Sequence, residues 1–262
     1  MPAHPVGLRL GKRVAAECAA IDKALRDRTL IQGRVHEARK AIRRVRALLA
    51  LVERHLDVAA EDRVLQQMGD GLSALRDAFA ASQVAVEVGK IDGRARWSPV
   101  AKALRKRADD VAVRVLRADP GFHARRLRLQ RIAQRLTMLP WDSISSARIK
   151  AGLLRQCKRT DRAGARAKAD PSPDNLHRWR RRTRRLRMQF DIVDHMRIAR
   201  ADIPTHASRK LHKRSDTLGW HQDLEILSAL LRRLPGITDR KDLLLRLASL
   251  GGEVQAEVGE VH

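Results

Sequence analysis

The most constraining feature of the chain is a basic segment that occurs twice. Residues 35–46 read VHEARKAIRRVR and residues 176–187 read LHRWRRRTRRLR, which aligns His36 with His177 without a gap. A weaker match follows at a nearly equal spacing, with LSALRD at residues 72–77 and LGWHQD at residues 218–223. Chance similarity between basic segments rarely preserves both order and spacing. The repeat therefore predicts two structurally similar halves related by a pseudo-two-fold axis.

The composition favours helices over strands. Tyr is absent, Phe occurs three times and Trp four times, so the aromatic residues that strands prefer are scarce. The apolar periodicity predicts helices over residues 7–28, 34–56, 60–88, 99–117, 122–138, 143–168, 174–196, 205–233 and 239–257. We therefore expect an all-α fold in which each half, roughly residues 1–120 and 140–262, forms a four-helix bundle. The helix at residues 122–138 would join the two halves.

The charge of the chain is concentrated on the repeated segments. The sequence has 55 Lys and Arg against 30 Asp and Glu, a formal net charge of +25, which indicates a polyanionic partner. On a helical projection, each repeated segment has one apolar face and one cationic strip with the histidine in its middle. Residues 178–187 hold seven arginines and no acid. Because like charges at i,i+4 destabilise a helix, these strips are predicted to bind an anion.

The surroundings of the strips narrow the chemistry of that anion. The sequence has no Gly-rich phosphate loop of the kind that binds a single nucleotide. Proteins that bind single-stranded nucleic acid stack bases on exposed aromatic residues, but Trp179 projects onto the apolar face and Trp97 and Trp141 stand at helix borders. Arginines that recur at every turn suit the repeating phosphates of inorganic polyphosphate. Nucleic-acid binding, as in a nucleoid-associated protein, is the alternative.

The paired motif H-x-x-R-[KR]-x-x-R-R-[VL]-R, each copy followed by L-x-x-x-x-D, resembles the CHAD domain, or conserved histidine α-helical domain. The resemblance covers nearly the whole chain and implies a stand-alone single domain. It further implies two pseudo-two-fold-related four-helix bundles with a basic central surface or pore that binds inorganic polyphosphate. It nominates as binding residues His36, Arg39, Lys40, Arg43, Arg44, His177, Arg180, Arg181, Arg184 and Arg185. Arg46 and Arg187, at the edges of the strips, complete the predicted site on these two helices.

The third helix of each half is expected to add basic residues to this site. In the second half the residues that fit are Arg209, Lys210, Lys213 and Arg214. The first half has Val64 and Gln67 at the corresponding positions, so the sequence predicts a site weighted toward the second half. Asp77 and Asp223, at the ends of the weaker match, are expected to hold neighbouring arginines so that their guanidinium groups point at the ligand.

The other titratable residues predict neither an enzyme nor a metal site. The motif histidines lack a second ligand at i+3 or i+4, the acids are scattered, and no cofactor is expected. We interpret both histidines as phosphate donors, whose pKa surrounding cations lower and a bound polyanion raises. Capping or packing at the start of each helix is the other interpretation. An accessory role beside a phosphatase or kinase is a second alternative function.

The cysteine content and the hydropathy pattern bear on location. Cys18 and Cys157 are expected to be buried free thiols, because no spacing suggests a disulfide framework or a metal site. No run approaches the ~20 apolar residues of a membrane span, and the N-terminal segment does not resemble a secretory signal. We expect a cytoplasmic protein associated with polyphosphate granules and without a membrane partner. The sequence does not predict an oligomeric state.

Overall fold

The computed structural model describes residues 6–27, 30–93, 96–198 and 208–260, and within the last segment the side chains of residues 210–254. The helices are α1 (Val6–Arg26), α2 (Ile31–Val52), α3 (Ala59–Asp70), α4 (Ser73–Asp92), α5 (Trp97–Ala118), α6 (His123–Thr137), α7 (Ser146–Ala169), α8 (Pro173–His195), α9 (Ser208–Leu231) and α10 (Arg240–Glu260). Two short 3-10 helices, η1 (Pro120–Phe122) and η2 (Trp141–Ser143), flank α6. The described residues form no strand, which confirms the all-α prediction.

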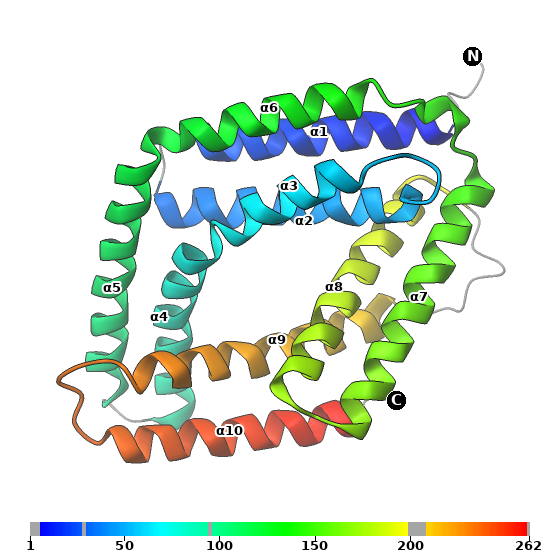
Figure 1. The fold of residues 1–262 in the computed structure, drawn as a ribbon. Helices are drawn as coiled ribbons and strands as arrows, with labels where there is room; N and C mark the ends of the chain where they lie inside the picture. Colours follow the sequence, from blue (N-terminus) through cyan, green and yellow to red (C-terminus); the bar gives the residue numbers. More distant parts are fainter. Residues whose placement is uncertain (1–5, 28–29, 94–95, 199–207, 261–262) are drawn as a thin grey trace.

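The helices are arranged in pairs around a central region. Figure 1 shows α1 and α6 along one side, α4 and α5 along the second, α9 and α10 along the third, and α7 and α8 along the fourth. One hydrophobic core is built from α4, α5, α9 and α10, and a larger one joins α1, α2, α3 and α6 to α7 and α8. Both cores therefore take helices from the two halves of the chain, which fixes the halves relative to each other.

The segment predicted as one helix over residues 60–88 is two helices. The α3 helix ends at Asp70, Gly71 follows as its C-cap, and α4 begins at Ser73. Glycine inside a helix costs about 1 kcal/mol relative to alanine, and Gly69 and Gly71 weaken this stretch together. The amphipathic periodicity continues through the break, so it conceals the change of direction.

Close contacts between α2 and the helices of the second half hold the two strips face to face. Buried Gln189 of α8 donates a hydrogen bond from Nε2 to the carbonyl oxygen of Ala47 at 2.8 Å, and buried Gln156 of α7 donates to that of Ala50 at 3.2 Å. A Cβ atom added at Gly152 of α7 would lie 2.0 Å from the carbonyl oxygen of Leu51. Only glycine allows the backbones of α7 and α2 to approach this closely.

Both cysteines are buried free thiols, as predicted. Burial raises the pKa of Cys18 and of Cys157 to about 11, which keeps both thiols protonated and unreactive. None of the helices among the described residues is long and apolar enough to cross a membrane.

Candidate anion-binding site

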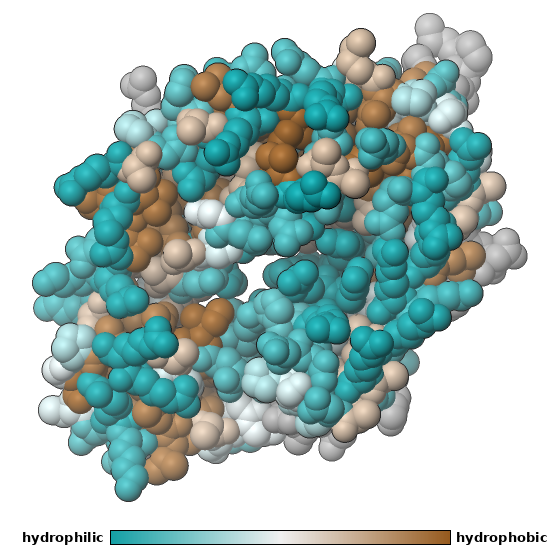
Figure 2. All heavy atoms as spheres, in the orientation of Figure 1, coloured by the Kyte–Doolittle hydropathy of each residue, from teal (hydrophilic) through white to brown (hydrophobic). Residues whose placement is uncertain are grey.

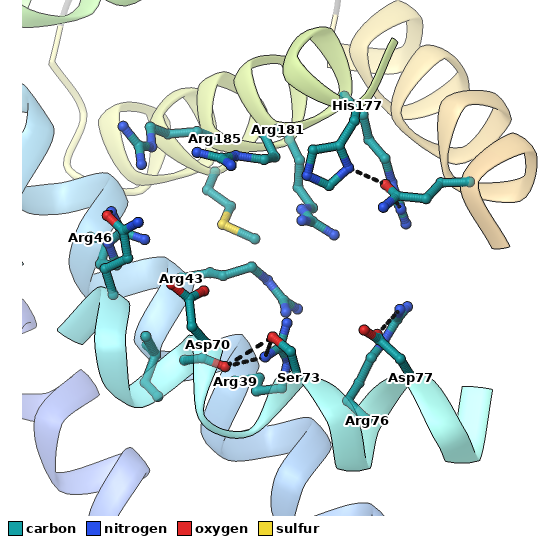
Figure 3. Close-up of a pocket in the computed structure, with 17 residues that line it drawn as sticks. Arg39, Arg43, Arg46, Asp70, Ser73, Arg76, Asp77, His177, Arg181 and Arg185 are labelled. Carbon is teal, nitrogen blue, oxygen red and sulfur yellow. Dashed lines mark hydrogen bonds and ion pairs between the residues drawn. The ribbon is translucent and has the colours of Figure 1, made fainter. Parts of the chain in front are cut away.

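The two repeated helices face each other across a cavity of about 260 Å³ in the middle of the molecule. Figure 2 shows an opening at the centre of one face, bordered largely by hydrophilic side chains. Figure 3 shows the side chains of α8 pointing across this space toward those of α2 and α4. The charged residues that line the cavity are eight arginines, one histidine and two aspartates: Arg39, Arg43, Arg46, Arg76, Arg180, Arg181, Arg184, Arg185, His177, Asp70 and Asp77.

Half of the residues predicted for the site line this cavity. They are Arg39, Arg43 and Arg46 from α2 and His177, Arg180, Arg181, Arg184 and Arg185 from α8. Five of the eight come from the second half, all of them on α8 and none on the third helix, where the sequence predicted the surplus. The eight arginines of the cavity themselves divide equally, four from each half.

Three basic residues predicted on α2 and α8 lie outside the cavity, and each is near an acid. Nε of Arg44 donates to Oε2 of the buried Glu17 at 2.7 Å. The ammonium of Lys40 lies 3.8 Å from Glu37. Arg187 lies 3.7 Å from Asp216 and donates to His212 at 3.2 Å.

The three predicted basic residues of α9 whose side chains the structure describes, Lys210, Lys213 and Arg214, do not line the cavity either. Lys213 precedes Gln222, the α9 residue at the cavity, by about two and a half helical turns and so faces the opposite side of the helix. Lys210 is exposed, and the guanidinium of Arg214 stacks 5.3 Å from the ring centroid of Trp179. The side chain of Arg209 lies outside the described residues.

Two cavity residues that the prediction missed, Arg76 and Gln222, occupy equivalent positions in the weaker sequence match. Each immediately precedes the aspartate of its segment, so the alignment of LSALRD with LGWHQD was the signal that could have found them. The two aspartates converge on Arg76, with Nη1 2.9 Å from Asp77 and Nη2 3.5 Å from Asp223. The expectation that these acids hold an arginine in place is met at Arg76.

Three arginines of the cavity, Arg43, Arg184 and Arg185, are partly buried and lie close to other cations. Burial, and then the charges of Arg43 and Arg180, lower the pKa of Arg184 to about 8. Burial followed by Arg39 lowers the pKa of Arg43 to about 10, and burial followed by Arg46 lowers that of Arg185 to about 10. All three groups remain cationic at pH 7. An anion placed between them would offset the free-energy cost of burying these guanidinium groups and of their mutual repulsion.

The break between α3 and α4 positions Arg39. Its Nη1 donates to the carbonyl oxygen of Gly69, near the end of α3, and to Oγ of Ser73 at 2.7 Å. The first residue of the cavity strip is therefore held by backbone and hydroxyl groups, and its charge stays available to a ligand.

The hydrogen bonds of His177 fix the location of its proton. Nη1 of Arg180 donates to Oε1 of Gln222 at 2.6 Å, and because a guanidinium can only donate, the accepting atom must be the amide oxygen. Nδ1 of His177 lies 2.6 Å from the same oxygen and must also donate, so Nε2 is the atom that gains or loses a proton. Burial is the main cause that lowers the pKa of His177, followed among the neighbouring charges by Arg181 and Arg180.

The equivalent His36 is exposed at the edge of the cavity. Its Nε2 lies 3.9 Å from Glu37, and it does not line the cavity. Burial lowers its pKa most, Glu37 opposes that shift, and Arg43 adds to it. The predicted direction of both histidine pKa shifts is confirmed, with burial ahead of the neighbouring cations as the cause. No group of three or more His, Cys, Asp or Glu residues within the described part of the chain could hold a metal ion.

The fold and the cavity define an all-helical protein with a central cavity lined by arginines. The sequence of residues 10–232 matches the CHAD domain, and the chain belongs to that family. No curated protein matches the sequence.

Solved structures share the fold at low sequence identity. PptA from Streptomyces chartreusis is 18% identical, with a TM-score of 0.65, and the match covers 98% of this chain and 96% of that one. The CHAD domain from the plant Ricinus communis is 19% identical, with a TM-score of 0.64 and coverage of 98% and 89%. At these identities the likeness concerns the fold alone.

Proposed function

We propose that the protein binds inorganic polyphosphate in the central cavity and acts as a binding module without catalytic activity. The observation that carries the proposal is the convergence of eight arginines, from both halves of the chain, on one cavity that holds two aspartates. One of these aspartates, Asp77, is already paired with Arg76. Guanidinium groups bind phosphate oxygens bidentately, so a chain of phosphates lying between α2 and α8 would find a donor at every helical turn.

The aromatic residues favour polyphosphate over single-stranded nucleic acid. None of the seven aromatic side chains is exposed, and Trp97, Trp179 and Trp141 are 1%, 2% and 5% exposed. Stacking of bases on aromatic side chains supplies much of the affinity for single strands, and the cavity has no aromatic residue among those that line it. The cavity offers charge and guanidinium hydrogen bonds, which a ligand made of phosphates alone would use fully.

Competition binding tests the choice of ligand. We expect long-chain polyphosphate to bind more tightly than DNA or RNA of equal charge at about 150 mM salt, where weak surface electrostatics are screened. Arg43→Gln with Arg184→Gln should weaken polyphosphate binding by about a hundredfold or more, since each charge-assisted contact is worth about 1.5–3 kcal/mol. Arg107→Gln with Arg114→Gln, two exposed arginines of α5, removes the same charge away from the cavity and serves as the control. Equal or tighter binding of nucleic acid would overturn the proposal.

The non-catalytic role and the cellular location need separate measurements. Incubation of polyphosphate with the protein and Mg²⁺ or Mn²⁺ should release no phosphate, because the carboxylates of the cavity lie beside arginines and not in a cluster that could hold a metal. A fluorescent fusion should collect at polyphosphate granules and lose this localisation when Arg43 and Arg184 are both replaced. Phosphate release that the same double variant abolishes would show that the site is an enzyme.

A further inference from the structure

A second group of arginines lies where α7 and α8 meet the end of α2, outside the central cavity. We call Arg54, Arg155, Arg159 and Arg182 the outer arginines. Arg182 stands on α8 beside Arg181, which lines the cavity. The close approach of α7 to the end of α2 brings the α7 arginines toward Arg54, which lies two residues after Val52, the last residue of α2.

The electrostatics show that these arginines form a continuous series with the cavity. Burial lowers the pKa of Arg182, and Arg159 and then Arg181 lower it further. Burial likewise lowers the pKa of Arg155, followed by Arg54 and, after an opposing effect of Glu53, by Arg159. Each arginine is thus close enough to the next for its charge to be felt.

Few acids compensate this series. Glu53 is the acid that raises the pKa of Arg155 and of Arg182, and its Oε1 already accepts a hydrogen bond from Nη1 of Arg159 at 2.6 Å. Nε and Nη2 of Arg155 are buried and make no hydrogen bond with any residue that the structure describes. A half-buried guanidinium with unsatisfied donors, next to further cations, is costly to the folded chain unless an anion binds it.

We propose that the outer arginines extend the central site, so that a polyphosphate chain filling the cavity continues over α8 onto α7 and the end of α2. The proposal rests on the proposed function, because it takes polyphosphate as the ligand, and adds to it a preference for long chains over short ones. A compact anion can occupy the cavity alone, whereas only a linear polyanion reaches Arg181 and Arg155 at the same time. The affinity for polyphosphate should therefore increase with the length of the phosphate chain, because a longer molecule contacts more arginines.

The test compares two ligands on one variant. Arg155→Gln with Arg182→Gln removes two outer arginines that make no ion pair within the described residues. We expect tripolyphosphate to bind the variant and the wild type equally, within about twofold, and long-chain polyphosphate to bind the variant roughly tenfold more weakly at low salt. The slope of log Kd against log salt should fall by about 1.5 for the long chain only, as loss of two phosphate contacts requires.

Exposed Arg162 and Arg166 of α7 provide the matched control, since Arg162→Gln with Arg166→Gln removes the same charge from the same helix. Thermal unfolding checks that the outer variant is at least as stable as the wild type, as expected when repelling charges are removed. Unchanged affinity for the long chain, an equal loss for both ligands, or an equal loss in the control would overturn the proposed extension while leaving central binding intact. Failure of the wild type to bind either ligand would instead refute the proposed function.

Discussion

Replacement of Arg184 by methionine should stabilise the folded protein when no polyanion is present. Arg184 lies close to Arg43 and Arg180, and burial with these charges lowers its pKa from the usual arginine value to about 8. A base whose pKa is lower in the folded state destabilises that state wherever it is charged. This cost to folding is fully present below pH 8 and disappears as the pH rises from about 8 toward the usual arginine pKa, so it applies at pH 7.

The size of the effect follows from the same shift. At about 1.4 kcal/mol for each pKa unit, the fall of this pKa to about 8 gives an upper bound on the order of 6 kcal/mol. Water in the open cavity screens the repulsion, so we expect Arg184→Met to raise the free energy of unfolding by about 1–3 kcal/mol. In a chain of this length that corresponds to a rise of roughly 2–10 °C in Tm at low salt. Methionine keeps most of the apolar stem, which separates the charge from the packing.

A matched control variant and an added polyanion test whether the stabilisation of Arg184→Met is electrostatic. Arg44→Met removes an arginine from the other repeated helix, where it pairs with buried Glu17 at 2.7 Å, and should lower the free energy of unfolding by about 1–3 kcal/mol. Tripolyphosphate should raise the Tm of the wild type more than that of Arg184→Met. An Arg184→Met protein that is less stable than the wild type at low salt without polyanion would refute the electrostatic reasoning. So would equal stabilisation of both proteins by tripolyphosphate.

Three further outcomes follow from the geometry. Polyphosphate affinity should rise as the pH falls from about 7 to below 6.5, because a bound polyanion raises the lowered histidine pKa values and the complex takes up protons. Calorimetry in two buffers measures this proton uptake, and His36→Gln with His177→Gln should abolish it. Gly152→Ala should lower the free energy of unfolding by about 2–4 kcal/mol in urea titrations, since its Cβ would meet the carbonyl oxygen of Leu51 at 2.0 Å. An unchanged midpoint of the urea unfolding transition would contradict that contact. Lys213→Gln should keep polyphosphate affinity within about twofold of the wild type. A tenfold loss would show that the opposite face of α9 contributes to binding.

The repeat and its helical periodicity were sufficient to predict the strips that build the cavity. Arg39, Arg43, Arg180 and Arg184 occupy equivalent positions in the two copies, and all four line it. Their neighbours could not be sorted by periodicity, because a cationic strip is broader than the cavity that it faces. Pairing with an acid does not sort them either, because Arg44, held by Glu17, lies outside the cavity, whereas Arg46, held by Asp62 at 2.8 Å, lines it. The packing of the helices decides which residues at the edge of a strip reach the cavity.

The break between α3 and α4 was hidden for a similar reason. Helix propensity at Gly69 and Gly71 is poor, but isolated glycines are tolerated within helices, and the apolar pattern continues on both sides. The break becomes favourable once Arg39 donates to the carbonyl oxygen of Gly69 and to Ser73, residues about thirty positions further along the chain. A contact of that range is a property of the folded chain and leaves no local signal.

The asymmetry between the two histidines follows from a single substitution between the repeats. In the second half Gln222 accepts hydrogen bonds from both His177 and Arg180, which holds the imidazole half-buried beside the cavity with its titrating nitrogen free for a ligand. The equivalent residue in the first half is Arg76, which can only donate and therefore cannot accept a hydrogen bond from His36. His36 is accordingly exposed and close to Glu37, while Arg76 adds a cation to the cavity in place of an acceptor. The two halves thus use the same position differently: one fixes a histidine that can respond to pH, and the other supplies a permanent charge.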